Sequence, residues 1–261
     1  MLTLDVTTRL RELAHERKPL LVATDLDGTL APIVADAAEA RVPPAALAVL
    51  DRLARAAKVA VITGRDLNTA RRMVPCDEVV IMGSHGLEAS IERGLLPEAD
   101  RMHLAAALEK IEQHVISRVP SAFVHIERKA ISTAFHFRKA PELEGPLRAA
   151  LKTLPKGLKL REGRMVLEVL PDERGGKDVA LLALARHFKA KSVFVMGDDL
   201  TDVAMFRAAL KLRDEGLPAL LVGVSGHEET PPQIAELADF MVHSTDEAQE
   251  ALETMARALG V

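Results

Sequence analysis

The feature that most constrains the fold of this chain is a series of short apolar runs that end in small or acidic residues. The runs span residues 20–24, 59–63, 79–83, 193–197 and 219–224. Segments with helical periodicity lie between them, as at residues 44–57 and 177–188. Continuous β-branched runs that alternate with amphipathic helices indicate a parallel sheet covered on both faces. We therefore predict an α/β protein whose ligand binds beyond the carboxyl ends of the strands.

The pattern changes in the middle of the chain. A helix, a hairpin, a second helix and a second hairpin are expected in turn, at residues 101–118, 122–127 with 131–138, 142–154 and 158–170, the last turning at 162–164. This order indicates an α+β unit with an antiparallel sheet, inserted between two halves of the parallel core. Because Pro97 and Pro171 mark its ends, we predict a core of residues 1–96 and 172–261 and an inserted cap of residues 97–171.

Charge and composition narrow the classes of partner. The 261 residues include 38 acidic and 34 basic side chains, a formal charge of −4, without a long block of like charge, so we expect no nucleic-acid partner. The single cysteine, Cys76, cannot form an internal disulfide, which favours a reducing compartment. The first twenty residues carry charges throughout, and no later stretch reaches the roughly 20 apolar residues that cross a bilayer. We expect a cytoplasmic monomer with no membrane partner.

The first chemical motif is the sequence TDLDGTL at residues 24–30, directly after the first predicted strand. It places two carboxylates, Asp25 and Asp27, one residue apart at a strand end. Asp25 can attack phosphorus as a nucleophile, while Asp27 protonates the leaving oxygen and later activates water. Taken alone, the motif is better explained as a strand followed by an Asp-Gly turn.

The second motif is GDDLTD at residues 197–202, which follows another apolar run and gathers the carboxylates of Asp198, Asp199 and Asp202. Mg²⁺ prefers oxygen ligands and keeps few protein carboxylates. Carboxylates packed this closely repel one another unless a cation is present. A helix N-cap with acidic first-turn residues is the alternative, and the presence of the first motif favours the metal site.

Two weaker elements lie between these motifs. Thr63, Gly64 and Arg65 end a strand and offer a hydroxyl and backbone amides at an expected helix N-terminus, where phosphate is favoured. The sequence Gly175-Gly176-Lys177 opens another helix, and the Lys177 ammonium can neutralise phosphate charge.

The order of these four motifs resembles that of the haloacid dehalogenase phosphohydrolase superfamily. The resemblance spans residues 25–202 and implies a Rossmann-like parallel-sheet core with an inserted α+β cap. It implies Asp25 as nucleophile, Asp27 as general acid/base, and Thr63 and Lys177 as phosphate ligands. It also implies a Mg²⁺ site formed by Asp25, Asp27 through its backbone carbonyl, Asp198, Asp199 and Asp202.

Within that superfamily the chain resembles the trehalose-6-phosphate phosphatase family. The stretches that carry this resemblance are DLDGTLAPI at 25–33, GSHGLE at 83–88, ERK at 127–129, HFR at 136–138, LEV at 167–169 and GDDLTDVAMF at 197–206. It implies that Glu127, Lys129 and Glu168 hydrogen-bond glucose hydroxyls. Five further residues are implied to contact the substrate or to orient its neighbours: Gly64, Arg65, His85, His136 and Arg138.

The resulting prediction is a phosphoric monoester hydrolase that converts trehalose 6-phosphate to trehalose and phosphate, a step of trehalose biosynthesis, through an aspartyl-phosphate intermediate with Mg²⁺. Val203 and Phe137 stand where the family commonly carries glutamate and tyrosine, which leaves the exact sugar open. The alternatives are a phosphatase of sucrose phosphate or a glycosyl phosphoglycerate, a phosphomutase with the same aspartyl-phosphate chemistry, and a phosphosugar-binding module without turnover.

Overall fold

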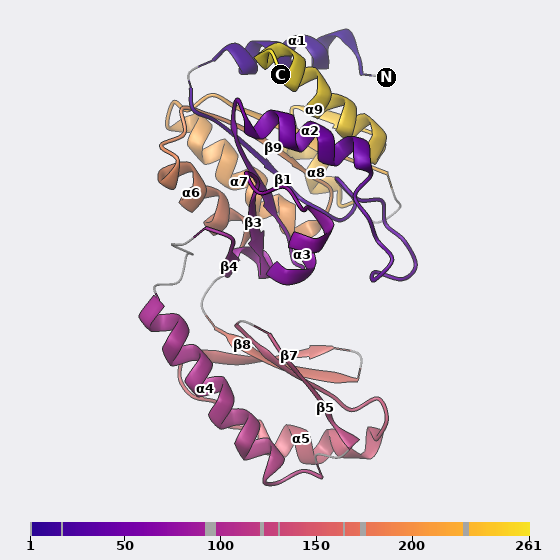
Figure 1. Cartoon of the computed structure of the whole chain (residues 1–261), viewed down its shortest axis with the longest axis vertical. Helices are drawn as coiled ribbons and strands as arrows, with labels where there is room; N and C mark the ends of the chain where they lie inside the picture. Colours follow the sequence, from indigo (N-terminus) through magenta and orange to yellow (C-terminus); the bar gives the residue numbers. More distant parts are fainter. Residues whose placement is uncertain are drawn as a thin grey trace. The chain divides into compact units, whose positions relative to one another are not determined.

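A computed structural model describes residues 2–16, 18–91, 98–120, 123–129, 131–163, 165–172, 176–226 and 230–261, with the backbone alone for 98–101. The chain divides into two compact units, Met1–Leu95 with Gly175–Val261 and Leu96–Arg174 (Figure 1). Some boundaries and turns expected from the sequence, at Pro97, Ala122, Arg164 and Gly175, lie outside the described residues.

The first unit is built on a seven-stranded sheet with the order β11-β10-β9-β1-β2-β3-β4. Its strands are β1 (Leu20–Thr24), β2 (Lys58–Ile62), β3 (Val80–Gly83), β4 (Glu88–Ala89), β9 (Ser192–Gly197), β10 (Ala219–Val224) and β11 (Phe240–Val242). Neighbouring strands are parallel except for the short β4, which pairs antiparallel with β3. Strand β1 therefore lies between β2 and β9.

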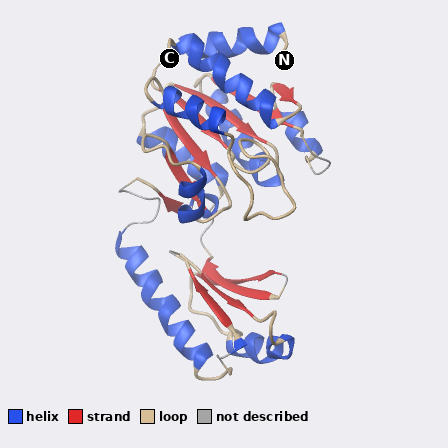
Figure 2. Ribbon diagram, turned by 45° about the vertical axis from the view of Figure 1, so that its right-hand side comes forward, coloured by secondary structure: helices blue, strands red, loops and turns tan. Residues whose placement is uncertain are grey.

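Helices cover both faces of this sheet (Figure 2). One face packs against α1 (Leu4–His15), α2 (Pro44–Ala54), α3 (Leu67–Met73) and α9 (Thr245–Leu259), and the other against α6 (Lys177–His187), α7 (Leu200–Asp214) and α8 (Pro232–Leu237). Alternate side chains of β1 divide between the two layers, with Leu20 and Val22 in one and Leu21 and Ala23 in the other. This two-sided burial is the reason why the strand is apolar from Leu20 to Ala23.

The second unit has a four-stranded antiparallel sheet with the order β5-β6-β8-β7. Its strands are β5 (His125–Arg128), β6 (Thr133–His136), β7 (Leu158–Gly163) and β8 (Val166–Pro171). Helices α4 (Glu98–Ile116) and α5 (Glu144–Ala150) bury apolar side chains such as Ile111 and Leu147 against Phe135 and Leu167 of the sheet. The row formed by Glu127, Ala134, Glu168 and Arg161 alternates with the buried rows and so lies on the opposite face.

Element boundaries differ modestly from those expected. The helix expected at 101–118 runs over Glu98–Ile116, and the one expected at 142–154 is the shorter α5, which follows the 3₁₀ turn Pro141–Leu143. The helix expected at 44–57 ends at Ala54. Among the helices of the described ranges, none is both long and apolar enough to cross a membrane.

Candidate active site

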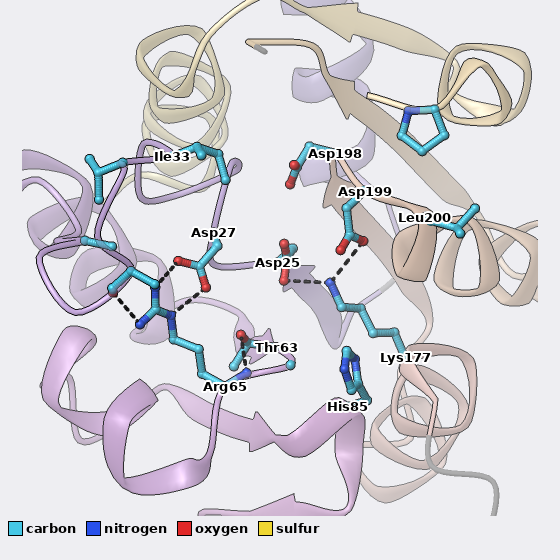
Figure 3. Close-up of a pocket in the computed structure, with 15 residues that line it drawn as sticks. Asp25, Asp27, Ile33, Thr63, Arg65, His85, Lys177, Asp198, Asp199 and Leu200 are labelled. Carbon is cyan, nitrogen blue, oxygen red and sulfur yellow. Dashed lines mark hydrogen bonds and ion pairs between the residues drawn. The ribbon is translucent and has the colours of Figure 1, made fainter. Parts of the chain in front are cut away.

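The carboxyl ends of the central strands bring the expected polar residues together. Asp25, Thr63 and Asp198 are each the first residue after a strand, and the three strands β2, β1 and β9 are neighbours in the sheet. These side chains line a cavity of about 650 Å³, within the range of small-ligand sites (Figure 3). Asp27, Arg65, His85, Lys177 and Asp199 line the same cavity.

Asp25 and Lys177 form a buried ion pair at the floor of this cavity. The Lys177 Nζ lies 2.7 Å from Asp25 Oδ1, and the two residues are 2% and 3% exposed. Burial raises the pKa of the Asp25 carboxyl to about 7, Lys177 opposes the rise, and Asp198 and Asp199 add to it. Burial alone would lower the pKa of Lys177, but the surrounding carboxylates outweigh it and raise the pKa, so the ammonium stays charged.

The three acidic residues that follow β9 have different partners. Asp198 accepts a hydrogen bond from the Thr29 hydroxyl at 2.7 Å. Asp199 is the N-cap of α7, where its Oδ1 accepts the N–H groups of Thr201 and Asp202 at 2.8 and 3.0 Å. Asp202 accepts from Lys177 at 2.8 Å through Oδ1 and from the N–H groups of Asp198 and Asp199 through Oδ2. The helix-cap and metal-site interpretations of this motif thus apply to different residues.

The donor set at this position suits a divalent cation. Asp25, Asp198 and Asp202 each offer a carboxylate oxygen, and these atoms lie within 4.8 Å of one another in the part of the chain described. All three residues are buried, which makes their mutual repulsion costly without a compensating charge. Because both oxygens of Asp202 already accept hydrogen bonds, Asp25 and Asp198 are the better placed to ligate.

Gly28 allows the first motif to approach the last one. It has a φ of +84°, which favours glycine, and a Cβ built at this position would lie 2.2 Å from Asp198 Oδ2. The Asp198 carboxylate therefore occupies the space that a side chain at residue 28 would need. This contact is a physical reason for the Asp-Gly pair that the sequence displays.

Asp27 does not share the partners of Asp25. Its two carboxylate oxygens accept hydrogen bonds from Nε and Nη2 of Arg65, both at 2.7 Å, and Figure 3 shows the guanidinium forked across them. The third guanidinium nitrogen, Nη1, donates to the carbonyl of Ala37 at 2.9 Å. The hydrogen bonds that Arg65 donates to the Asp27 carboxylate raise the pKa of Arg65 above its ordinary value.

The expectation that Thr63 and Gly64 stand at a helix N-terminus is wrong. Helix α3 begins at Leu67, and its N-cap is Asp66, whose side chain accepts the N–H of Thr69. Thr63 is buried, and its hydroxyl accepts the backbone N–H of Arg65 at 3.2 Å. The helix starts later because Asp66 is the better capping residue.

The His85 ring packs directly against Gly64 in the wall of the cavity. A Cβ at residue 64 would lie 2.7 Å from the His85 ring, so glycine is required for the imidazole to fit. His85 and Ser84 belong to a 3₁₀ turn, Ser84–Gly86, and both have positive φ. The buried Glu88 holds this turn, because its carboxylate accepts the Ser84 hydroxyl at 2.7 Å and the Leu67 N–H at 3.0 Å.

Four of the expected sugar-binding residues form a cluster in the second unit. Lys129 Nζ lies 3.3 Å from Glu168 and 4.0 Å from Glu127, and His136 Nε2 lies 2.9 Å from Glu127. Glu168 also accepts from the Ser132 hydroxyl at 2.7 Å. These side chains share the face of the antiparallel sheet that is opposite α4 and α5.

Glu168 stays ionised within this cluster. Its burial acts to raise the pKa, but hydrogen bonds from Ser132 and Arg161 and the charge of Lys129 outweigh it, so that the pKa is lowered. Arg138 is exposed after the end of β6 and, in the described ranges, makes no hydrogen bond or ion pair with the cluster.

The two residues that depart from the family pattern are both buried. Phe137 is 2% exposed and packs with α4 and α5, and Val203 is 5% exposed in the layer that contains α6 and α7. Neither lines the 650 Å³ cavity.

Sequence reasoning assigned no role to three residues that hold site groups in place. Thr29 orients Asp198, Glu88 anchors the turn that carries His85, and Arg161 contacts Glu168. Thr29 and Glu88 lie in the motifs TDLDGTL and GSHGLE, so their presence in these motifs could have indicated a role at the site. Arg161 had none, because only the register of β7 against β8 places it opposite Glu168.

Comparison with known proteins decides the family. The sequence profile of the family described as Trehalose-phosphatase matches residues 23–235. The chain belongs to this trehalose-phosphatase family. Among relatives, a trehalose-phosphate phosphatase of Mycobacterium bovis is 29% identical over 245 residues, which cover 86% of this chain and 61% of the relative. A Sinorhizobium fredii protein named as a probable trehalose-phosphate phosphatase is 32% identical over 199 residues, which cover 72% of this chain and 73% of that protein.

Solved structures of the family agree with the fold. The Aspergillus fumigatus trehalose-6-phosphate phosphatase superposes with a TM-score of 0.61 at 24% identity, covering 98% of each chain. A haloacid dehalogenase-like hydrolase from Bacteroides thetaiotaomicron gives 0.58 at 14% identity, covering 90% of this chain and 99% of that one. The predicted α/β fold is therefore confirmed, and the profile match confirms the predicted trehalose-phosphatase family. The chain spans about three fifths of the length of the mycobacterial relatives.

Proposed function

We propose that the protein hydrolyses trehalose 6-phosphate to trehalose and phosphate through an aspartyl-phosphate intermediate on Asp25, with Mg²⁺ as cofactor. The observation that carries the proposal is the buried Asp25 carboxylate, 2.7 Å from Lys177 Nζ and in one cavity with Asp27, Thr63 and Asp198. Membership of the trehalose-phosphatase family supports the substrate.

The residues of the cavity can carry both halves of such a reaction. An oxygen of Asp25 attacks phosphorus, the bond from phosphorus to the sugar oxygen breaks, and Asp27 gives that oxygen a proton. Water then attacks the phosphorus, Asp27 takes a proton from it, and the bond to Asp25 breaks to release phosphate. Lys177 and the Thr63 hydroxyl stabilise the phosphoryl oxygens, which is the main need of phosphoryl transfer.

We assign the metal to Asp25 and Asp198, with the backbone carbonyl of Asp27, and Asp202 and Asp199 as residues that orient them. When bound, Mg²⁺ would offset negative charge on the phosphoryl group. The assignment rests on the buried carboxylates and on the hydrogen bonds that already occupy Asp202 and Asp199.

We propose that residues 97–171 act as the cap that selects the sugar. The sequence contains neither tryptophan nor tyrosine, so recognition of a hydroxyl-rich ring falls to charged and other polar side chains. The cluster of Glu127, Lys129 and Glu168 offers carboxylate acceptors and an ammonium donor close together.

Phosphate release from a panel of substrates tests the catalytic proposal. The panel contains trehalose 6-phosphate, sucrose 6-phosphate, a glucosyl phosphoglycerate and glucose 6-phosphate, each with Mg²⁺ and with EDTA. We expect Mg²⁺-dependent release with a preference for trehalose 6-phosphate, lost in Asp25→Asn and kept in the exposed control Asp5→Asn. Efficient hydrolysis of another member but not of trehalose 6-phosphate would refute the substrate and keep Asp25. Absence of release from every member would favour a phosphosugar-binding module.

The cap proposal has its own test. Glu127→Gln and Glu168→Gln should raise KM for trehalose 6-phosphate while leaving hydrolysis of p-nitrophenyl phosphate, which has no sugar, nearly unchanged. Glu142→Gln removes a carboxylate from an exposed position of the same unit and serves as the matched control. Equal losses on both substrates would show that these residues support the fold rather than the sugar.

A further inference from the structure

Arg65 holds both oxygens of the residue that the proposed function needs for proton transfer. Its guanidinium donates to Asp27 Oδ2 and Oδ1, both at 2.7 Å, although the two residues are 38 positions apart. Side-chain exposure is 17% for Arg65 and 30% for Asp27, so the pair faces the cavity without being fully solvated. A forked pair of this kind is among the stronger hydrogen-bonded arrangements in proteins.

The backbone of Arg65 is fixed while its side chain has a choice of partners. The N–H of Arg65 donates to the Thr63 hydroxyl at 3.2 Å, and its carbonyl accepts the N–H of Ser84 at 2.7 Å. The guanidinium therefore starts from an anchored position beside Thr63, at the edge of the space where the proposed function puts the phosphate.

The forked pair conflicts with the role proposed for Asp27. A carboxyl group that gives a proton to the leaving oxygen must carry that proton on one oxygen and turn it toward that atom, whereas both oxygens of Asp27 accept hydrogen bonds from Arg65. A phosphate monoester that enters beside Asp25 and Thr63 presents the same oxygen geometry to the guanidinium and carries more negative charge. The Asp27 carboxylate and the phosphate then compete for the guanidinium of Arg65.

We propose that Arg65 exchanges Asp27 for the phosphate of the substrate, so that substrate binding itself releases the Asp27 carboxylate, which takes up a proton from water and then gives it to the leaving oxygen. The ligand class is a phosphate monoester, and Arg65 acts both as a phosphate ligand and as the residue that positions Asp27 before the substrate arrives. The inference rests on the proposed function and deepens it.

A double-mutant cycle on phosphate binding tests the exchange without turnover. The dissociation constant of inorganic phosphate is measured by calorimetry with Mg²⁺ for the wild type, Asp27→Asn, Arg65→Met and the double variant. We expect Asp27→Asn to tighten phosphate binding about tenfold or more when Arg65 is present, because the guanidinium no longer has to give up its ion pair with a carboxylate to bind phosphate. In the Arg65→Met background the same change removes only a nearby negative charge, and we expect a tightening of about two- to threefold.

Three further measurements test this interpretation. Arg71→Met, at an exposed position of α3, is the matched control and should leave phosphate binding unchanged. Arg65→Lys keeps the charge without the fork, should recover less than half of the lost affinity, and replaces Arg65→Met in the cycle if that variant does not fold. Steady-state kinetics of Arg65→Met should show a raised KM as well as a lowered kcat, since a purely structural residue would instead lower the fraction of folded enzyme.

The outcomes separate this inference from the function on which it rests. Equal tightening by Asp27→Asn in both backgrounds would overturn the exchange, even for an enzyme that hydrolyses trehalose 6-phosphate well. Strong coupling in a protein that releases no phosphate from any sugar would refute the proposed function and leave the exchange standing. Failure of the wild type to bind phosphate at all would overturn both.

Discussion

Replacement of Lys177 by methionine is expected to destabilise the first unit strongly. The ammonium lies 2.7 Å from Asp25, 2.8 Å from Asp202 and 3.7 Å from Asp199. Methionine keeps a long unbranched side chain but leaves Asp25 and Asp202 buried without their cation. Removal of one partner from a buried ion pair typically costs about 3–5 kcal/mol. For a chain of this size that corresponds to a fall in Tm of about 6–20 °C.

The loss should depend on pH with a definite sign. Burial raises the pKa of Asp25 from 3.8 to about 7, so the folded state binds a proton between these values that the unfolded state does not. Stability therefore falls as pH rises through this window. Without the ammonium of Lys177, which opposes the rise, the Asp25 pKa moves higher and the fall continues above pH 7. The pKa of Lys177 is itself raised, so its charge is present throughout the range tested.

Urea unfolding followed by circular dichroism, at pH 5.5 and 8.5 with EDTA, measures both effects. The sequence contains no tryptophan, so intrinsic fluorescence of that residue is not an option. Lys191→Met, at an exposed position, is the matched control. Two results would refute the view that Lys177 compensates the burial of these carboxylates. One is a difference in unfolding free energy between the wild type and Lys177→Met below about 1 kcal/mol at pH 8.5. The other is a difference that is the same at both pH values.

Three further predictions follow from the same site. Gly28→Ala should lower the unfolding free energy by about 1–3 kcal/mol and weaken Mg²⁺ binding, because its Cβ would meet Asp198. Denaturation and metal titration measure these effects. An unchanged metal affinity would contradict the importance of this contact. Glu88→Ala should cost about 1–3 kcal/mol and raise KM, because Ser84 loses its acceptor, while Glu88→Gln should recover part of both losses. Mg²⁺ should raise Tm more at pH 8.5 than at pH 5.5, because the Asp25 carboxyl must lose its proton to ligate, and an equal shift at both pH values in calorimetry would exclude Asp25 as a ligand.

The elements that the sequence predicted well are those with a local cause. Residues 20–24 and 219–224 are strands over the whole expected range, because both faces of these strands are buried and apolar residues fill almost every position. The ends of the helices were predicted less accurately from the sequence. Asp66 caps α3 three residues beyond the position expected from Thr63 and Gly64, because its side chain satisfies a backbone N–H that glycine cannot.

The pairing of charged groups could not be predicted from local pattern. Five aspartates were candidate metal ligands in the sequence. Only the fold shows that Asp27 pairs with Arg65 and that Asp199 is the N-cap of α7. The contact between Thr29 and Asp198 joins residues 169 positions apart and depends on β1 and β9 being neighbours. The positions of Asp25, Thr63 and Asp198 at strand ends predicted that they would lie together, and they do line one cavity, while sheet order and burial determine which groups are in contact.

The central position of β1 affects the order in which parts of the chain can fold during synthesis. Synthesis delivers β1 early, but β9, which completes one of its edges, arrives about 170 residues later. The unit Leu96–Arg174 is continuous in sequence and can complete its own sheet in the meantime. The cavity that Asp25 and Lys177 line is thus among the last parts of the molecule to assemble. A chain interrupted before residue 177 would carry Asp25 with an unpaired strand edge beside it and without the cation that its burial requires.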